Sequence, residues 1–245
     1  MQLIRFHEQL QQLSTAVSVD QLTAMCLEQA RVLGFDHVVY ALRSPTRFTE
    51  SRLIMVDAYP DGWVRHYLRQ ANYVSDPVIA YCTRNVAPVK WSELRTEPGS
   101  AAERVMNEAR EFGLHDGISM PVHGPHGEQG ILSLTTRGGP AHADDVTRHS
   151  LPYAPLMATF LHDALRRVSG LMDDPQRPAL TERELDCLRW AADGKTSGEI
   201  AQLLTLTEST INFHFGNAVR KLDVSSRQHA VARAALQGYL RPMPF

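Results

Sequence analysis

Apolar residues recur along the chain with two different spacings, and the first part of the chain shows both. Ser18 begins a predicted helix whose apolar residues lie about four positions apart and which ends at Gly34. Residues 37–42 and 53–58 are rich in β-branched and apolar side chains, as is typical of strands. Helical and extended segments therefore alternate in this part of the chain.

A hairpin and several further helices follow. Residues 117–122 and 130–135 flank the turn sequence 124–128 and predict an antiparallel hairpin. Trp91 and Ser133 fall on predicted strands. Helices are predicted to begin at Pro60, at Asp76–Pro77 and at Ser100, and a long helix from about Asp144 to Val168 is predicted to bend near Pro152 and Pro155. This order predicts an α-β-α sandwich with a mainly antiparallel sheet.

The last part of the chain has only the helical spacing. Residues 169–178 contain a glycine, two prolines and adjacent acids, and we interpret them as a linker. Four short helices are predicted after it, with capping residues at Thr181 with Glu184, Thr196 with Glu199, Thr207, and Ser225 with Gln228. We therefore predict an α+β protein with a sandwich domain at 1–168, a linker at 169–178 and a four-helix domain at 179–245.

The third helix of that domain has an apolar side and a polar side. Ile211, Phe215, Ala218 and Leu222 form the apolar stripe. The opposite side carries Ser209, Asn212, Asn217, Arg220 and Lys221. Such a helix fits the major groove of double-stranded DNA, where an asparagine at position 212 can bond both polar atoms of an adenine edge. Phosphate contacts are predicted at Lys195, Arg220 and Lys221, supported by Thr196, Thr207 and Ser209. A helical bundle that binds another protein has the same pattern.

Composition narrows the class of protein. The 245 residues are 43% hydrophobic and 21% charged, which is typical of a globular protein. No apolar run is long enough to span a membrane, the first residues do not resemble a secretory signal, and the three scattered cysteines indicate reduced thiols, so we expect a cytoplasmic protein. The net charge is −2, but the residues from Pro175 onward carry +2, and this places any phosphate-binding surface in the helical domain.

Several side chains of the first domain combine an apolar body with a polar tip. They are Tyr59, Trp63, Tyr67, Asp76, Trp91 and Ser133. A carboxylate among apolar groups needs a hydrogen-bond donor, so this set suits a small amphipathic ligand with an amide N–H and a carbonyl. Each residue also has a structural interpretation. Asp76 can cap the helix that begins at Pro77, the tryptophans can be core residues, and Ser133 can bond nearby backbone.

Two sets of motifs point to one family. In the tail they are L-T-x-R-E at 180–184, G-K-T-S-x-E-I-A at 194–201 and S-T-I-N-F-H-x-x-N-x-x-x-K-L at 209–222. Before the linker they are Y-P-x-x-W-x-x-H-Y at 59–67, Y-x-x-D-P at 73–77, Trp91, E-A-x-x-x-G-L at 108–114, M-P-V-H-G at 120–124 and G-x-L-S-L at 130–134. The tail resembles the LuxR-type (GerE-like) DNA-binding domain, and residues 1–168 resemble the autoinducer-binding domain of LuxR-type acyl-homoserine-lactone receptors.

The resemblance assigns roles to residues of both domains. It implies that Trp63 donates to the lactone carbonyl, that Asp76 accepts from the amide N–H, and that Tyr59 and Ser133 hold the acyl carbonyl. Trp91 and Tyr67 would line the pocket around the head group of the lactone ligand. Val78 stands where a family member has a hydroxyl, and the small Ala41 leaves room for a medium or long acyl chain. In the tail, Asn212, Phe213 and Gly216 would face the groove, although Gly216 replaces the longer side chains often found there, and the last helix, around Arg227–Tyr239, would mediate dimerisation.

The implied function is ligand-dependent regulation of transcription in quorum sensing. The effector would be an acyl-homoserine lactone, and a homodimer would bind a pseudo-palindromic promoter site, with RNA polymerase as a further partner and no cofactor. The alternative is a regulator of the same architecture that responds to another ligand or needs none. We expect no enzyme, because a G-x-S-x-G nucleophile motif and a Cys–His pair are missing. We expect no metal at His115, His123 and His126, which lack further ligands at suitable spacing.

Overall fold

The computed structural model describes residues 3–124, 127–171 and 178–240. These residues group into two compact units, one containing 3–43, 53–124 and 129–171, the other 44–52, 127–128 and 178–240. Most of the predicted linker lies outside the described residues, as do His126 of the predicted turn and the last five residues of the tail.

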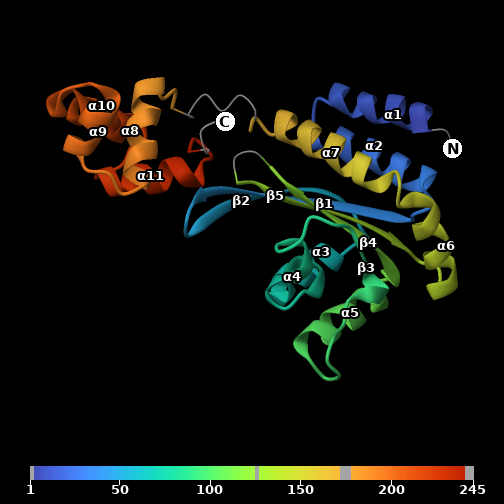
Figure 1. Cartoon of the computed structure of the whole chain (residues 1–245). Coiled ribbons are helices and arrows are strands. Elements are labelled where there is room, and N and C mark those ends of the chain that lie inside the picture. The colour runs from blue at the N-terminus through green and yellow to red at the C-terminus, as the bar shows by residue number, and fades with distance from the viewer. Residues whose placement is uncertain (1–2, 125–126, 172–177, 241–245) are drawn as a thin grey trace. The chain divides into compact units, whose positions relative to one another are not determined.

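A five-stranded sheet forms the centre of the first part of the chain, with the strand order β2-β1-β5-β4-β3 (Figure 1). The strands are β1 (His37–Arg47), β2 (Glu50–Ala58), β3 (Val89–Lys90), β4 (Asp116–His123) and β5 (Gln129–Thr136). The pairs β1–β5, β5–β4 and β4–β3 are antiparallel. The predicted hairpin is confirmed as β4 and β5, in which Ser119 pairs with Ser133.

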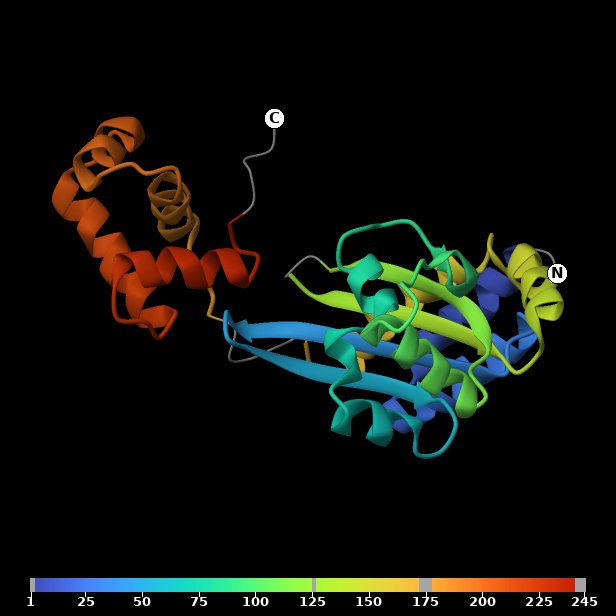
Figure 2. The same cartoon turned by 90° about the horizontal axis from the view of Figure 1, so that it is seen from below.

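Helices cover both faces of this sheet, as two perpendicular views show (Figures 1 and 2). One face carries α1 (Leu3–Gln11), η1 (Gln12–Thr15), α2 (Val19–Val32) and α7 (Ala154–Val168), with α6 (Pro140–Ser150) at one end. The other face carries α3 (Trp63–Arg69), η2 (Asn72–Val74), α4 (Pro77–Cys82), η3 (Trp91–Glu93) and α5 (Ala101–Glu111). The predicted α-β-α sandwich is therefore confirmed.

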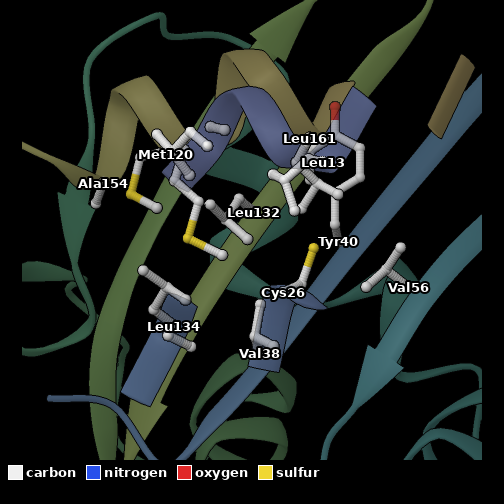
Figure 3. Close-up of a cluster of buried hydrophobic side chains, with 14 of the residues drawn as sticks. Leu13, Cys26, Val38, Tyr40, Val56, Met120, Leu132, Leu134, Ala154 and Leu161 are labelled. Carbon is white, nitrogen blue, oxygen red and sulfur yellow. The ribbon is translucent and has the colours of Figure 1, made fainter. Parts of the chain in front are cut away.

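The main core lies between the sheet and α1, α2 and α7. Alternate residues of each strand point into it because side chains along a strand alternate between faces. Figure 3 shows Val38 and Tyr40 of β1, Met120 of β4, and Leu132 and Leu134 of β5 together with Leu161 of α7. All of these are fully or almost fully buried. The residues between them on the strands face α3, α4 and α5, where the candidate ligand site lies.

Three predicted element boundaries are wrong. The long helix from Asp144 to Val168 is two helices, α6 and α7, because Pro152 lacks the N–H that would continue the first. Helix α3 begins at Trp63 instead of Pro60, after Gly62, which adopts a positive φ of 85°. Trp91 lies in the 3-10 helix η3, directly after the two-residue strand β3.

The last part of the chain forms a helical unit of α8 (Glu182–Ala192), α9 (Ser197–Leu204), α10 (Glu208–Lys221) and α11 (Arg227–Leu236). Its core contains Ile200, Ile211, Phe215 and Ala218. Capping boxes are present at Thr181 and Thr196, and Thr207 caps α10, all as predicted. The cap of α11 is Ser226, bonded to the N–H of His229, and not Ser225.

Candidate ligand site and nucleic-acid interface

A second apolar cluster lies on the sheet face that carries α3, α4 and α5. It brings together residues that are far apart in the sequence: Trp63, Val78, Cys82, Trp91, Met106, Ala109 and Leu114, with Tyr59, Tyr67, Tyr81 and Ile131 packed against them. Five of the predicted ligand residues belong to this cluster: Tyr59, Trp63, Tyr67, Val78 and Trp91. We call the seven buried residues of this cluster, together with Tyr59, Tyr67, Tyr81 and Ile131, the second-face cluster.

Asp76 lies beside this cluster at the start of α4 and uses both carboxylate oxygens. One accepts from the backbone N–H of Val78 at 2.7 Å, which confirms the capping interpretation. The other accepts from the hydroxyl of Tyr67 at 2.6 Å. Burial raises the pKa of Asp76, and the bonds from Tyr67 and Val78 oppose this only in part. The capping role and a ligand role are compatible, because a carboxylate has about four lone-pair sites.

Trp91 and Ser133 are joined through a residue that the sequence reasoning missed. The indole N–H of Trp91 donates to Ser119 Oγ at 2.9 Å, and Ser119 Oγ lies 2.7 Å from Ser133 Oγ. Ser119 and Ser133 are directly opposite each other in the β4–β5 hairpin. The turn centred near position 126 would have given this register, since paired residues lie at equal distances from the centre of a hairpin turn.

The hydroxyl of Tyr59 is buried and makes no hydrogen bond with the described residues. Burial raises its pKa, and the nearby hydroxyls of Ser133 and Thr135 oppose the shift without reaching hydrogen-bonding geometry. A buried phenol without a partner is unfavourable by about 1–3 kcal/mol. This hydroxyl is therefore a donor for which a ligand oxygen is a suitable acceptor.

Two of the predicted ligand residues, Ala41 and Val78, are apolar. Ala41 is half-buried on β1, where it pairs with Ile131 of β5, a residue that packs against the second-face cluster. Val78 is buried within the cluster. The structure thus places Ala41 and Val78 on the same face of the sheet as Tyr59 and Ser133.

Glu108 of α5 supports Trp63 through His66 of α3. His66 stacks on Trp63 with ring centroids 6.0 Å apart, and its Nε2 atom lies 2.9 Å from Glu108 Oε2. Glu108 also accepts from Asn72 Nδ2 at 2.8 Å. The bonds from Asn72 and His66 hold the pKa of Glu108 below its usual value. Trp63 is therefore held in position by residues from α3, η2 and α5.

The predicted DNA-binding face lies on α10. Ile211 is fully buried, while Ser209, Asn212, Phe213, Gly216 and Arg220 are exposed. Phe213 is 65% exposed, which is high for an aromatic side chain. A Cβ added at Gly216 would meet no atom within 4 Å, so this position leaves open space on the face. Asn217 is half-buried at its edge and accepts from Arg220 at 3.0 Å.

The remaining predicted DNA contacts have different surroundings. Thr196 and Thr207 are exposed helix caps, and Lys195 is half-buried. The ammonium of Lys221 is already used, since it donates to Glu184 Oε2 at 2.8 Å and to the carbonyl of Ala179 at 3.0 Å. The prediction of a phosphate contact at Lys221 is thereby weakened, because the charge serves a buried carboxylate within the unit.

Neither a metal-binding cluster nor a membrane-spanning helix is present among the described residues. No group of three or more histidine, cysteine or acidic side chains is placed to hold a metal ion there. Within the same residues, no helix is both long enough and apolar enough to cross a membrane.

Comparisons with known proteins agree with this arrangement. Residues 18–165 match the autoinducer binding domain, and residues 178–234 match the bacterial regulatory proteins of the luxR family. The transcriptional activator protein AhyR of Aeromonas hydrophila is 35% identical over 241 residues, which cover 96% of this chain and 92% of that protein. The transcriptional activator protein LuxR of Aliivibrio fischeri is 29% identical, with 87% and 86% covered.

Solved structures give the same result. The crystal structure of Escherichia coli SdiA superposes with a TM-score of 0.74 at 25% identity and covers 96% of this chain and 97% of that chain. A complex of SdiA with octanoyl-rac-glycerol has the same fold, with a TM-score of 0.75 at 24% identity. The relatives are transcriptional activators and not enzymes. The chain therefore belongs to the LuxR family of quorum-sensing transcription regulators, with an autoinducer-binding domain followed by a DNA-binding domain.

Proposed function

We propose that the effector of this regulator is an N-acyl-homoserine lactone with a medium or long acyl chain, bound at the second-face cluster. Residues 1–168 would form the sensing domain, 169–178 the linker and 179–245 the DNA-binding domain. The ligand-bound protein would act as a homodimer in the cytoplasm, on a pseudo-palindromic promoter site in double-stranded DNA and in contact with RNA polymerase.

The observation that carries this proposal is the pairing of a half-buried acceptor with a buried donor. Asp76 offers carboxylate lone pairs, and the Tyr59 hydroxyl makes no hydrogen bond with the described residues. The trans amide of an acylated amine points its N–H and its carbonyl oxygen in opposite directions, and between these two residues it would donate to Asp76 and accept from Tyr59. Trp63, Tyr67, Trp91 and Ser133 would then surround the lactone ring and the carbonyl, in the roles that the family resemblance assigns to them.

The acyl chain would supply much of the affinity. Each buried methylene contributes about 0.8 kcal/mol, so eight further carbons would give up to roughly 6 kcal/mol before ordering costs. Ala41, Val78 and Ile131 provide apolar surface on the correct face. Asp76 and Tyr59 would therefore set the class of ligand, while the length of the acyl chain would set how tightly the ligand binds.

Base reading would fall to the exposed face of α10. Asn212, Phe213 and Gly216 lie at its centre, with Ser209, Asn217 and Arg220 around them. Lys195, Thr196 and Thr207 would bind phosphates from the loops and helix starts beside it. In a dimer, two such faces would meet major grooves about one or two helical turns apart.

Thermal unfolding of the full-length protein with a panel of acyl-homoserine lactones tests the ligand. A ligand that binds only the folded protein raises its stability by RT ln(1 + [L]/Kd), so the midpoint should rise with chain length up to an optimum. Octanoyl glycerol is tested in parallel as a different kind of ligand. In the variant Tyr59→Phe, which lacks only the hydroxyl, lactone should raise the unfolding midpoint by less than in the wild type. Stabilisation by octanoyl glycerol alone would favour the alternative of a different effector. No stabilisation by any lactone would overturn the proposal.

A further inference from the structure

Asn212, at the centre of the proposed base-reading face, is held by a chain of hydrogen bonds that begins at Arg227. Arg227 Nη1 donates to Ser197 Oγ at 3.0 Å, and Ser197 Oγ donates to Asn212 Oδ1 at 2.8 Å. The three residues come from α11, α9 and α10. Asn212 is exposed, whereas Ser197 and Arg227 are half-buried.

Arg227 is fixed independently of Asn212. Its Nη2 atom donates to the carbonyl of Lys195 at 2.7 Å, and its guanidinium carbon lies 4.0 Å from the centre of the Phe215 ring. A cation over an aromatic face is stabilised by the ring quadrupole. The start of the chain is thus anchored in the core of the helical unit.

The chemistry of Arg227 decides which group donates in the first of these hydrogen bonds. A guanidinium only donates hydrogen bonds and stays charged, so Ser197 Oγ must accept from Arg227. The serine hydroxyl keeps its own proton to donate, and the Asn212 atom that lies 2.8 Å from it is the amide oxygen. Asn212 therefore turns its oxygen toward Ser197 and leaves its NH2 group for the solvent side of α10.

This orientation changes the base that Asn212 suits. An asparagine makes two hydrogen bonds to adenine, because its amide oxygen accepts from N6 and its amide nitrogen donates to N7. Here the amide oxygen is turned toward Ser197 within the protein, so the NH2 group is the end of the amide that a base edge meets. A carboxamide that offers mainly donors is better matched to guanine, whose major-groove edge presents the two acceptors O6 and N7.

We propose that Ser197 and Arg227 are positioning residues that set the base preference of Asn212 toward guanine over adenine. The inference rests on the proposed DNA-binding face of α10 and deepens it. It differs from the adenine contact that the helical pattern predicts, which uses both ends of the Asn212 amide.

The experiment uses the full-length protein with lactone and a duplex selected from a randomised library. Binding titrations at fixed salt then compare duplexes that differ in one base pair. Asn212→Ala identifies the pair that Asn212 contacts, as the position where discrimination disappears. The test variant is Ser197→Ala, which frees the Asn212 oxygen. Ser197→Thr keeps the hydroxyl, and Ser225→Ala alters an exposed loop serine outside the chain of bonds. Thermal unfolding checks that each variant is folded.

Wild-type protein should favour guanine over adenine at that pair by about two- to tenfold, the range of one neutral hydrogen bond. Ser197→Ala should narrow or reverse this ratio, while Ser197→Thr and Ser225→Ala keep it. A general loss of affinity with the same ranking of bases would mean that Ser197 is only structural, and it would overturn the inference. A wild-type preference for adenine would do the same. Failure of the wild type to bind any duplex would instead overturn the proposed DNA-binding function itself.

Discussion

Replacing Lys221 with methionine tests whether this residue stabilises the helical unit or binds phosphate. Its ammonium lies 2.8 Å from Glu184, whose side chain is only 3% exposed, whereas that of Lys221 is 30% exposed. Removing one partner of a buried ion pair costs about 3–5 kcal/mol. Glu184 would keep its bond from the N–H of Thr181, and water can reach part of the site. We therefore expect the free energy of unfolding to fall by about 2–3 kcal/mol.

Native-state hydrogen exchange measures this loss within the unit, in peptides that cover α8 and α10 of the full-length protein. Arg220→Met is the matched control, because Arg220 is an exposed neighbour that bonds Asn217 on the same helix. Its effect on stability should stay within about 0.5 kcal/mol. The double variant Lys221→Met with Glu184→Leu should recover part of the loss, since an apolar pair no longer leaves a buried charge unpaired.

DNA titrations at several salt concentrations complete the comparison. The logarithm of the binding constant falls linearly with the logarithm of the salt concentration, and each lost phosphate contact reduces the size of this slope by about one. We expect this reduction for Arg220→Met and not for Lys221→Met. A structural role for Lys221 would be refuted if Lys221→Met were as stable as the wild type and lowered the slope as Arg220→Met does. The phosphate contact predicted from the sequence would then be correct.

Three further predictions concern Asp76, Tyr40 and Glu184. Asp76→Asn should raise the Kd for lactone about 10- to 100-fold, because hydrogen bonds to charged groups contribute about 1.5–3 kcal/mol, and calorimetric titration measures it. Tyr40→Phe removes a buried 2.7 Å bond to His162 and should lower the free energy of unfolding by about 1–2 kcal/mol in urea. Burial alone would raise the pKa of Glu184, but the bonds from Lys221 and Thr181 outweigh it and hold the pKa below its ordinary 4.5. Its contribution to stability should therefore be complete above pH ~4.5 and disappear as the pH falls through the lower folded-state pKa, as urea titrations at graded pH can show.

Local chemistry explains why much of the fold could be predicted from the sequence. The caps Thr181, Thr196 and Thr207 act over three residues, and each is confirmed. The hairpin also follows from a short turn sequence between two alternating segments. The error of one residue at Ser225, where Ser226 is the cap, arises because neighbouring residues of the same type can both serve as caps.

The arrangement of the sites depends on contacts that sequence patterns do not contain. Glu184 and Lys221 are 37 positions apart, and the helical spacing placed Lys221 only on the polar side of its helix. Trp91 and Ser119 are 28 positions apart and meet only after β3 and β4 pair. The bond from Ser197 to Asn212 likewise needs α9 and α10 packed together. Residue types could therefore be predicted for both sites, but not which of their polar atoms are already satisfied.

The most direct test of the central claim is an anisotropy titration of a selected operator duplex with full-length protein, with and without lactone, for the wild type and Asp76→Asn. We expect lactone to tighten operator binding by the wild type and to have little effect on the variant. Equal binding by both proteins with or without lactone, or no binding by either, would contradict the claim that occupancy of the second-face cluster controls the DNA-binding face of α10.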